Sequence, residues 1–272
     1  MFNAPHFSLP RLGAVACARV GALLGFLLLP LPAAALEVSA LTEALPPLNY
    51  EMNGKVVGFS SELLDLMTRE SGISISKKLL PWARAYELVT RQGNTLIYSM
   101  ARTPERETLF QWVGPISARR ILLYKLADRT DISIRTLDDA RHYRIGVVRE
   151  SAAAKGLLQQ GFALNGPQDA LGPGLDLGPH DESNMKKKFI ARRFDLLVSL
   201  DWAAAYNARN AGLGPDDYQA VWVLDESLSY WYGLNLATDP DVARRLNAAL
   251  QKLKNDGQYL LLKQKYLPRT SQ

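Results

Sequence analysis

The run Ile73-Ser-Ile-Ser-Lys-Lys-Leu-Leu-Pro-Trp-Ala-Arg-Ala-Tyr-Glu-Leu-Val-Thr-Arg-Gln-Gly-Asn-Thr-Leu-Ile-Tyr-Ser99 decides the class of fold. It begins with a short stretch, 73–78, that predicts a strand, and continues with a helical pattern over 82–92 that Gly93 ends. A second apolar run, 95–99, predicts another strand. A strand, a helix and a strand in this order are typical of a parallel αβ unit.

The same alternation runs along most of the chain. Residues 36–41 predict a strand, and residues 58–72 predict a helix with one apolar face. Residues 163–182 contain Gly, Pro, Asp and Asn without a period and predict a surface loop. The other predicted strands are 121–126, 143–148, 194–199 and 231–236, and the other predicted helices are 151–160, 184–193, 201–210, 240–254 and 258–266. Two such series favour two lobes built on largely parallel sheets.

The first 35 residues predict a secretory signal rather than part of the fold. Two arginines precede the apolar run 20–29, and small residues up to Ala35 follow it. We expect cleavage after Ala35. An uncleaved anchor is the alternative, although the run is shorter than the roughly 20 residues that span a bilayer. The only cysteine, Cys17, lies in this segment, and an exported chain without a mature cysteine is typical of a bacterial periplasm.

Composition and charge exclude several classes of protein. Of the 272 residues, 47% are apolar and 22% are charged, as in an ordinary globular protein. Two of the 32 Lys and Arg residues and none of the 27 Asp and Glu residues precede residue 36, so the net charge of +5 falls to about +3 in the mature chain. This is too weak to indicate nucleic acid as a partner. The chain contains no metal-ligand spacing and no phosphate-binding glycine loop, so we predict no cofactor and no metal.

Ligands of open αβ sheets bind beyond the carboxyl ends of the strands, where helices begin. After strand 95–99 comes Met100-Ala-Arg-Thr-Pro-Glu-Arg106, in which Arg102 and Arg106 are four residues apart. On a helical turn both guanidinium groups can point the same way, and each can hold a carboxylate by two hydrogen bonds. The alternative is that both arginines pair with the neighbouring glutamates on a solvated face.

This run, followed by Phe110-Gln-Trp-Val-Gly-Pro-Ile116, resembles the T-x-E-R … F-S-x-P signature of periplasmic solute-binding proteins of the polar amino acid type, family 3. The run Pro81-Trp-Ala-Arg84 is similar to that of one branch of the family. Further stretches agree with the family in order and spacing, so that the resemblance covers nearly the whole mature chain: Pro46-Pro-Leu-Asn-Tyr50, Gly54-Lys-Val-Val-Gly-Phe59, Tyr143-Arg-Ile-Gly-Val-Val148 and residues 247–266.

The resemblance implies an α/β, two-lobed periplasmic-binding-protein-like fold of type II, with a hinge and a cleft between the lobes. Lobe 1 would comprise residues 36–120 plus 230–272, and lobe 2 residues 121–229. Closure of the lobes around a ligand excludes water and strengthens each polar contact. The implied partners are a small-molecule ligand, an amino acid or another carboxylate, and an inner-membrane ABC permease. We expect a monomer.

The resemblance also assigns residues of lobe 1. Arg106 would hold the α-carboxylate of the ligand, and Ser99 would lie among the polar contacts. Trp82 stands where the family places an aromatic side chain against the ligand; the alternative is that it packs its helix onto the sheet. Arg84 faces either the cleft or the surface.

Two positions depart from the family pattern. Ala101 stands where the family usually has Ser or Thr, which removes one hydroxyl contact. Arg102 replaces a residue that is often apolar. A second cation beside the first suggests a doubly anionic ligand as a hypothesis, and outward pairing of Arg102 with an acid is the alternative.

In lobe 2, Arg149 and Ser151 lie between a predicted strand and a helix start, where backbone N–H groups favour an anionic group. Ser151 can equally cap its helix. The family often has an aspartate for the ligand's ammonium group at the position that Asp201 occupies, although the spacing here is one residue longer, and Asp201 can also only cap its helix. Glu43, after the first strand, is the other candidate for the ammonium group. Tyr230 lies near the second crossing between the lobes, as a wall or hinge residue.

Three functions compete at this point. The first is capture of an amino acid or a similar polar solute for a membrane transporter. The second is a sensor module of the same fold that signals through a membrane partner such as a sensor kinase. The third is a cyclohexadienyl (arogenate or prephenate) dehydratase, for which Glu43 or Asp201 would supply the general acid. We favour the first function and predict that the protein is not an enzyme, because the sequence offers few catalytic motifs. The other two are kept as alternatives because fold alone does not settle function.

Overall fold

Eight strands form one mixed sheet in the order β4-β1-β5-β10-β6-β9-β7-β8. The structure is a computed structural model that describes residue 1 and residues 37–165, 172–178, 182–214 and 216–267. The predicted signal and part of the predicted loop 163–182 lie outside the described residues. The strands of the sheet are β1 (Glu37–Thr42), β4 (Ser74–Leu79), β5 (Thr95–Ala101), β6 (Phe110–Leu126), β7 (Arg144–Val148), β8 (Gly174–Gly178), β9 (Leu196–Leu200) and β10 (Tyr218–Asn235).

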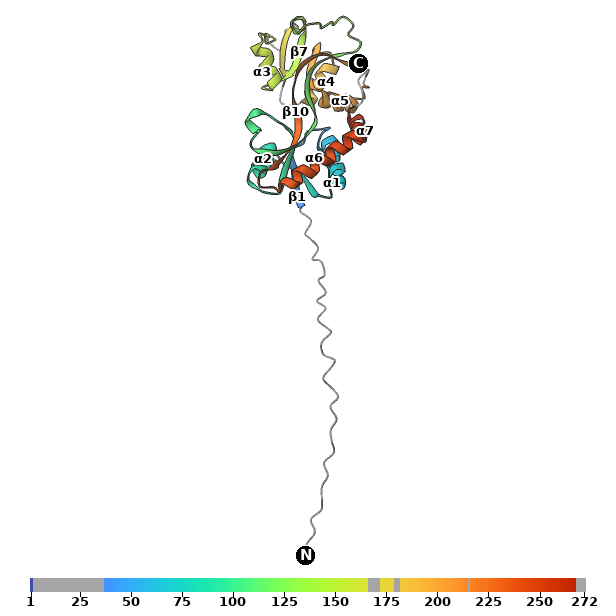
Figure 1. The fold of residues 1–272 in the computed structure, drawn as a ribbon. Helices are drawn as coiled ribbons and strands as arrows, with labels where there is room; N and C mark the ends of the chain where they lie inside the picture. Colours follow the sequence, from blue (N-terminus) through green and yellow to red (C-terminus); the bar gives the residue numbers. More distant parts are fainter. Residues whose placement is uncertain (2–36, 166–171, 179–181, 215, 268–272) are drawn as a thin grey trace. The chain divides into compact units, whose positions relative to one another are not determined.

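Seven α-helices and a small hairpin accompany this sheet in the described part of the chain (Figure 1). The helices are α1 (Phe59–Ser71), α2 (Trp82–Arg91), α3 (Ala152–Gln159), α4 (Glu182–Ile190), α5 (Asp201–Asn210), α6 (Pro240–Asn255) and α7 (Gln258–Tyr266). The hairpin consists of β2 (Tyr50–Met52) and β3 (Lys55–Val57), and Pro104–Arg106 and Leu137–His142 form 3-10 turns. None of the described helices is long and apolar enough to cross a membrane.

The sheet contains two parallel groups joined by two long antiparallel strands. Strands β4, β1 and β5 run parallel, and so do β9, β7 and β8. Strand β10 pairs antiparallel with both β5 and β6, and β6 pairs antiparallel with β9. The prediction of parallel αβ units is therefore confirmed for each group, whereas the joining strands are antiparallel.

Three predicted segments differ from the structure. The strand predicted at 121–126 is the end of β6, which begins eleven residues earlier at Phe110. The strand predicted at 231–236 is the end of β10, which begins thirteen residues earlier at Tyr218. The middle of β10 contains the polar run Asp225-Glu226-Ser227, and its pairing with β6 shifts register there. The sequence in this part therefore lacks the alternation of apolar residues that would predict a strand. The predicted loop 163–182 contains β8, a short strand at the edge of the sheet that pairs with β7, forms one bridge to Leu164 and is bounded by Gly174 and Gly178.

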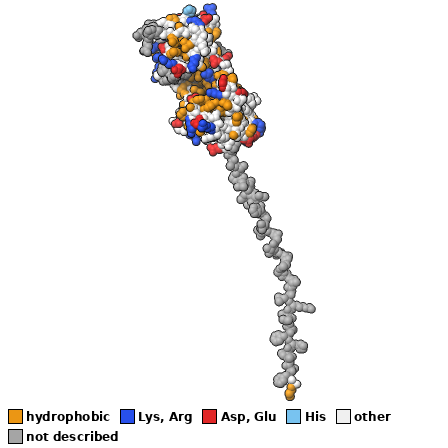
Figure 2. Space-filling model, turned by 90° about the vertical axis from the view of Figure 1, so that its left-hand side faces the viewer, with side chains coloured by type: hydrophobic (Ala, Val, Ile, Leu, Met, Phe, Trp, Pro, Cys, Tyr) orange, Lys and Arg blue, Asp and Glu red, His pale blue; other side chains and the backbone are white. Residues whose placement is uncertain are grey.

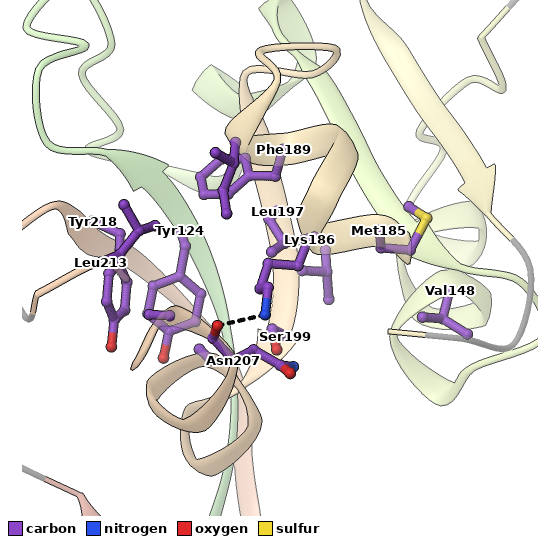
Figure 3. Close-up of a pocket in the computed structure, with 14 residues that line it drawn as sticks. Tyr124, Val148, Met185, Lys186, Phe189, Leu197, Ser199, Asn207, Leu213 and Tyr218 are labelled. Carbon is purple, nitrogen blue, oxygen red and sulfur yellow. Dashed lines mark hydrogen bonds between the residues drawn. The ribbon is translucent and has the colours of Figure 1, made fainter. Parts of the chain in front are cut away.

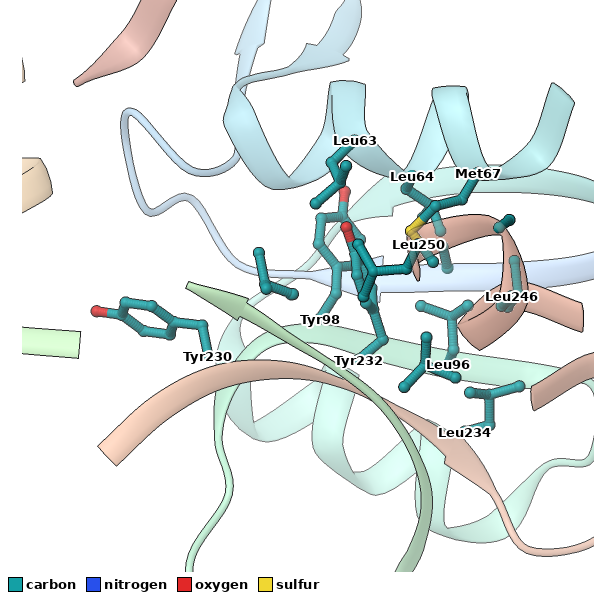
Figure 4. Close-up of a cluster of buried hydrophobic side chains, with 14 of the residues drawn as sticks. Leu63, Leu64, Met67, Leu96, Tyr98, Tyr230, Tyr232, Leu234, Leu246 and Leu250 are labelled. Atoms are coloured by element: carbon teal, nitrogen blue, oxygen red, sulfur yellow. The ribbon is translucent and has the colours of Figure 1, made fainter. Parts of the chain in front are cut away.

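Buried apolar side chains gather separately around each parallel group. Helices α1, α2 and α6 lie around β1, whereas α3 and α4 lie around β7 (Figure 1). Figure 4 shows part of the first core, in which Leu63, Met67, Tyr98, Tyr232 and Leu250 are fully buried. The second core uses the far half of β6 with β7 and β9. Each parallel group of the eight-stranded sheet thus has its own buried side chains, which form two clusters in each group of the described chain.

Candidate functional site

A hydrogen-bond network joins the loops that follow β1 and β5. Thr42 Oγ1 donates to the carbonyl of Tyr98 over 3.1 Å, and Asn49 Nδ2 donates to Thr42 Oγ1 over 2.8 Å. The Ser99 hydroxyl donates to Asn49 Oδ1. Thr42, Asn49 and Ser99 are buried, and Ser99 has a left-handed φ of 58°. The network fixes both loops at the carboxyl ends of neighbouring strands, where ligands of αβ sheets bind.

Glu43 follows this network directly. Asn49 Nδ2 also donates to the Glu43 backbone carbonyl, which holds the residue in place. Its carboxylate forms no hydrogen bond or ion pair with any described residue, and burial raises the pKa of this half-buried group. Glu43 therefore presents a carboxylate that can accept a cation.

Arg106 ends the 3-10 turn Pro104–Arg106. Its Nη1 donates to the carbonyl of Ala101 over 3.1 Å, and its guanidinium carbon lies 5.6 Å from the ring centres of both Trp82 and Tyr86. No carboxylate among the described residues pairs with it. The cation is positioned by one carbonyl and two aromatic faces, and its remaining N–H donors are free for a carboxylate.

Arg102, which was also a candidate, has a different environment. Its Nε donates to Glu107 Oε2 over 2.7 Å, and its Nη2 donates to Glu107 Oε1. Its guanidinium also lies 4.5 Å from the Trp231 ring centre and 5.4 Å from that of Trp112. The charge is already compensated by a two-pronged ion pair, so the structure favours outward pairing over contact with a second ligand anion.

The other two candidates of this region lie on α2. Arg84 Nη1 pairs with Glu87 Oε2 over 2.9 Å, and the Arg84 side chain is 56% exposed. Trp82 is half-buried and its ring centre lies 5.9 Å from that of Tyr86. At the start of α2, Arg84 thus pairs with Glu87 of the same helix, whereas Trp82 lies against Arg106.

The predicted anion site after β7 is a tight turn. Ser151 caps α3, because its hydroxyl accepts a hydrogen bond from the N–H of Ala154 over 3.1 Å. Arg149 is exposed, and its side chain forms no ion pair within the described residues. The capping alternative holds for Ser151, and Arg149 remains an available cation.

Asp201 begins α5 directly after β9 and is 9% exposed. Its Oδ1 accepts a hydrogen bond from the N–H of Trp202 over 2.8 Å, and burial raises the pKa of its carboxyl group to about 6. Trp202 stacks on Phe59 of α1 with ring centres 4.6 Å apart. This contact holds the start of α5 beside the first core, so Asp201 lies where the two groups of elements meet.

Tyr230, the last candidate, is a buried residue of β10. It pairs in register with Ala101 of β5 and Ser117 of β6, and only 4% of its surface is exposed. It therefore lies in a joining strand, beside the end of β5 that precedes the Arg106 turn, and its role as a wall or hinge residue stays a prediction.

Sequence reasoning missed Asn49 and Trp112 as parts of this region. Asn49 uses both its amide oxygen and its amide nitrogen to hold Ser99, Thr42 and Glu43. Its place directly after Pro46-Pro47-Leu48 was the available signal, because a buried amide in a proline-rich turn needs partners.

The mixed sheet, with two parallel groups joined by two long antiparallel strands, is the architecture of two-lobed binding proteins. The chain belongs to the bacterial extracellular solute-binding proteins, family 3, whose family model matches residues 38–269. This confirms the family and the fold class that the sequence motifs indicated.

Individual proteins agree with this assignment. The chain is 23% identical over 222 residues to the probable amino-acid-binding protein YxeM of Bacillus subtilis (strain 168), covering 81% of this chain and 79% of that protein. Its fold is similar to that of the second substrate-binding domain of Lactococcus lactis GlnP in its open conformation, with a TM-score of 0.71, 15% identity and coverage of 89% and 99% of the two chains. It is also similar to a histidine kinase sensor domain, with a TM-score of 0.60, 18% identity and coverage of 85% and 96%.

Proposed function

We propose that this protein captures an amino acid, or a similar small carboxylate that carries a cationic group, and delivers it to an ABC transporter. The observation that carries this proposal is the guanidinium group of Arg106, which is held by Ala101, Trp82 and Tyr86 and forms no ion pair with a described carboxylate, although its charge acts on the neighbouring Glu105. A positioned guanidinium group with free donors binds a carboxylate by two charge-assisted hydrogen bonds.

The two candidate acids support an ammonium group on the same ligand. Glu43 and Asp201 are both at least half-buried, and neither forms an ion pair with a described residue. An incoming ammonium group would offset the cost of burying these carboxylates. We assign Arg106 and Glu43 to one lobe, Asp201 to the other, and Arg149 to the rim of the site.

The proposed lobes are residues 36–120 plus 230–272 and residues 121–229. The separate cores around β1 and β7 support this division, because its boundaries fall within the joining strands β6 and β10. We infer a periplasmic protein that is released by cleavage after Ala35 and works as a monomer with an inner-membrane permease. Figure 2 shows basic side chains in small groups on the viewed face, with acidic and apolar side chains between them, which fits a small solute better than a polyanion.

A thermal-shift screen of the purified protein against amino acids, dicarboxylates and other small organic anions tests the proposal. A ligand at about 100 times its dissociation constant adds roughly 2.7 kcal/mol of stability and raises the melting temperature. Arg106→Ala should abolish the shift. Arg84→Ala is the matched control, since Arg84 already pairs with Glu87 at the surface, and it should keep the shift. A shift that survives Arg106→Ala would contradict the carboxylate assignment.

A sensor role is the second candidate, and the similarity to a histidine kinase sensor domain is the observation that favours it. Both roles need the same ligand site, so the membrane partner distinguishes them. Crosslinking of the ligand-loaded protein in membranes should capture a permease subunit for transport and a kinase for sensing.

A further inference from the structure

A pocket opens between α4 and α5. None of its lining residues belongs to the loops that carry Arg106 and Glu43, although the Asp201 carboxylate at the start of α5 interacts electrostatically with Tyr124 of the lining. Its volume is about 470 Å³, its open mouth included. Most of the lining is apolar, and Figure 3 shows these side chains together with several polar ones. The apolar wall includes Met185, Phe189, Leu197 and Leu213.

Two buried phenols face this pocket without hydrogen-bond partners. Tyr124 of β6 is 4% exposed and Tyr218 of β10 is 8% exposed, and their ring centres lie 5.6 Å apart. Neither hydroxyl group forms a hydrogen bond with another described residue. Neither hydroxyl oxygen is among the buried side-chain atoms of the described chain that lack a partner, so both are open to solvent and can donate to a ligand at one end of the pocket.

A lysine lies beside them. Lys186 of α4 is half-buried, and its Nζ donates to the backbone carbonyl of Asn207 on α5. No carboxylate among the described residues pairs with it, and burial lowers the pKa of its ammonium group. In Figure 3 Tyr124, Tyr218 and Leu213 lie on one side of Lys186, Met185 lies on the other side, and Phe189 lies above them. A cation, two donors and an apolar wall complement an amphipathic anion.

We propose that this pocket is a second ligand site, separate from the one that contains Arg106, and that it binds a small aromatic or branched aliphatic carboxylate. The carboxylate would pair with Lys186 and accept hydrogen bonds from Tyr124 and Tyr218, while the apolar body would pack against Phe189 and Leu213. The inference does not depend on the solute that the other site captures.

Calorimetric titration of the purified protein with phenylacetate tests this site. We expect saturable binding, which Lys186→Met weakens roughly tenfold or more because a charge-assisted contact is lost. Tyr218→Phe should weaken it roughly fivefold through loss of one hydrogen bond. Lys187→Met is the matched control, since Lys187 is an exposed neighbour on α4 that does not line the pocket, and it should leave the affinity unchanged.

Three results would overturn the proposal. The first is the absence of any heat of binding when millimolar phenylacetate is added, provided that circular dichroism shows the unmodified and Lys187→Met proteins to be folded. The second is equal affinity for the neutral analogue phenylacetamide, which would remove the role of Lys186. The third is loss of phenylacetate binding in Arg106→Ala, which would place the ligand at the other site.

Discussion

The buried carboxylate of Asp201 should lower the stability of the folded protein while it serves ligand binding. Burial raises its pKa from 3.8 to about 6, so the folded state holds this proton more tightly than the unfolded chain does. The folded state therefore loses stability as pH rises from about 4 through 6, where the ionised carboxylate must stay buried. Asp201→Asn should increase the free energy of unfolding by up to about 3 kcal/mol at pH 7 and by nothing below pH 4. Urea denaturation at several pH values measures this difference.

The same substitution should abolish binding of a ligand that needs the ionised carboxylate. The gain in unfolding free energy of Asp201→Asn over the unmodified protein should be larger at pH 7 than at pH 4. An equal gain at the two pH values would show that the carboxylate is not desolvated. Asp195→Asn is not a suitable control, because Asp195 pairs with Arg129 over 2.8 Å. Glu51→Gln is a better control, since Glu51 is an exposed residue of β2 whose carboxylate pairs with no described residue.

The backbone conformation of Ser99 also lowers the stability of the folded protein. Its φ of 58° is in the left-handed region, which a residue with a Cβ atom occupies at a cost of about 1–2 kcal/mol. Ser99→Gly and Ser99→Ala both remove the hydrogen bond to Asn49, so they differ chiefly in the backbone. We expect the Gly variant to be about 1 kcal/mol more stable than the Ala variant in chemical denaturation. Equal stabilities would indicate that the loop adopts another backbone conformation.

At the scale of elements, the start of α1 depends on close contact between two backbone segments. Gly58 has a φ of 111°, and a Cβ atom there would lie 2.6 Å from the carbonyl oxygens of Pro47 and Leu48. Gly54 also has a positive φ, of 72°, but a Cβ atom there meets nothing within 4 Å. Gly58→Ala should therefore destabilise the protein by about 3 kcal/mol or more, and Gly54→Ala by about 1 kcal/mol. Thermal denaturation of the two variants compares them, and similar losses would contradict a steric cause.

The sequence predicted the helices better than the joining strands, for a physical reason. Helices such as α2 and α6 carry an apolar stripe that a local pattern reveals. Strands β6 and β10 pair with each other along most of their length and pass between two cores, so their residues face different surroundings along one strand. No single period describes such a strand. Strand β8 was missed because its glycines and its edge position give little apolar signal.

The placement of the candidate site residues after strands was predictable from the sequence, but their pairings were not. The positions of Arg106, Glu43 and Asp201 after strands follow from the chain order alone. Whether a charge is free depends on contacts that the sequence does not contain. Arg102 and Arg106 have equivalent sequence surroundings, yet only Arg102 meets Glu107 and Trp231. That difference arises because the turn between them is a single 3-10 turn rather than an α-helix.

At the scale of the whole molecule, the two cores are linked by more than the strands that join them. Trp202 of α5 follows the second parallel group in the chain, yet it is 2% exposed within the first core, where it stacks on Phe59. Tyr206 of the same helix contacts Tyr50 of β2 with ring centres 5.7 Å apart. One face of α5 therefore packs on elements of the first group, which should couple the stabilities of the two cores.

This coupling predicts a single calorimetric transition for the protein without ligand. Trp202→Ala should lower the free energy of unfolding by about 3–5 kcal/mol, since it leaves a large cavity, and should separate the transition into two. Trp222→Ala is the matched control, because Trp222 of β10 packs only against the second core and should lower stability without separating the transition. If the Trp202→Ala protein still unfolds with equal calorimetric and van't Hoff enthalpies, β6, β10 and the remaining contacts of α5, such as Tyr206 with Tyr50, couple the two cores without Trp202. In that case Trp202 would contribute packing to the first core without linking it to the second.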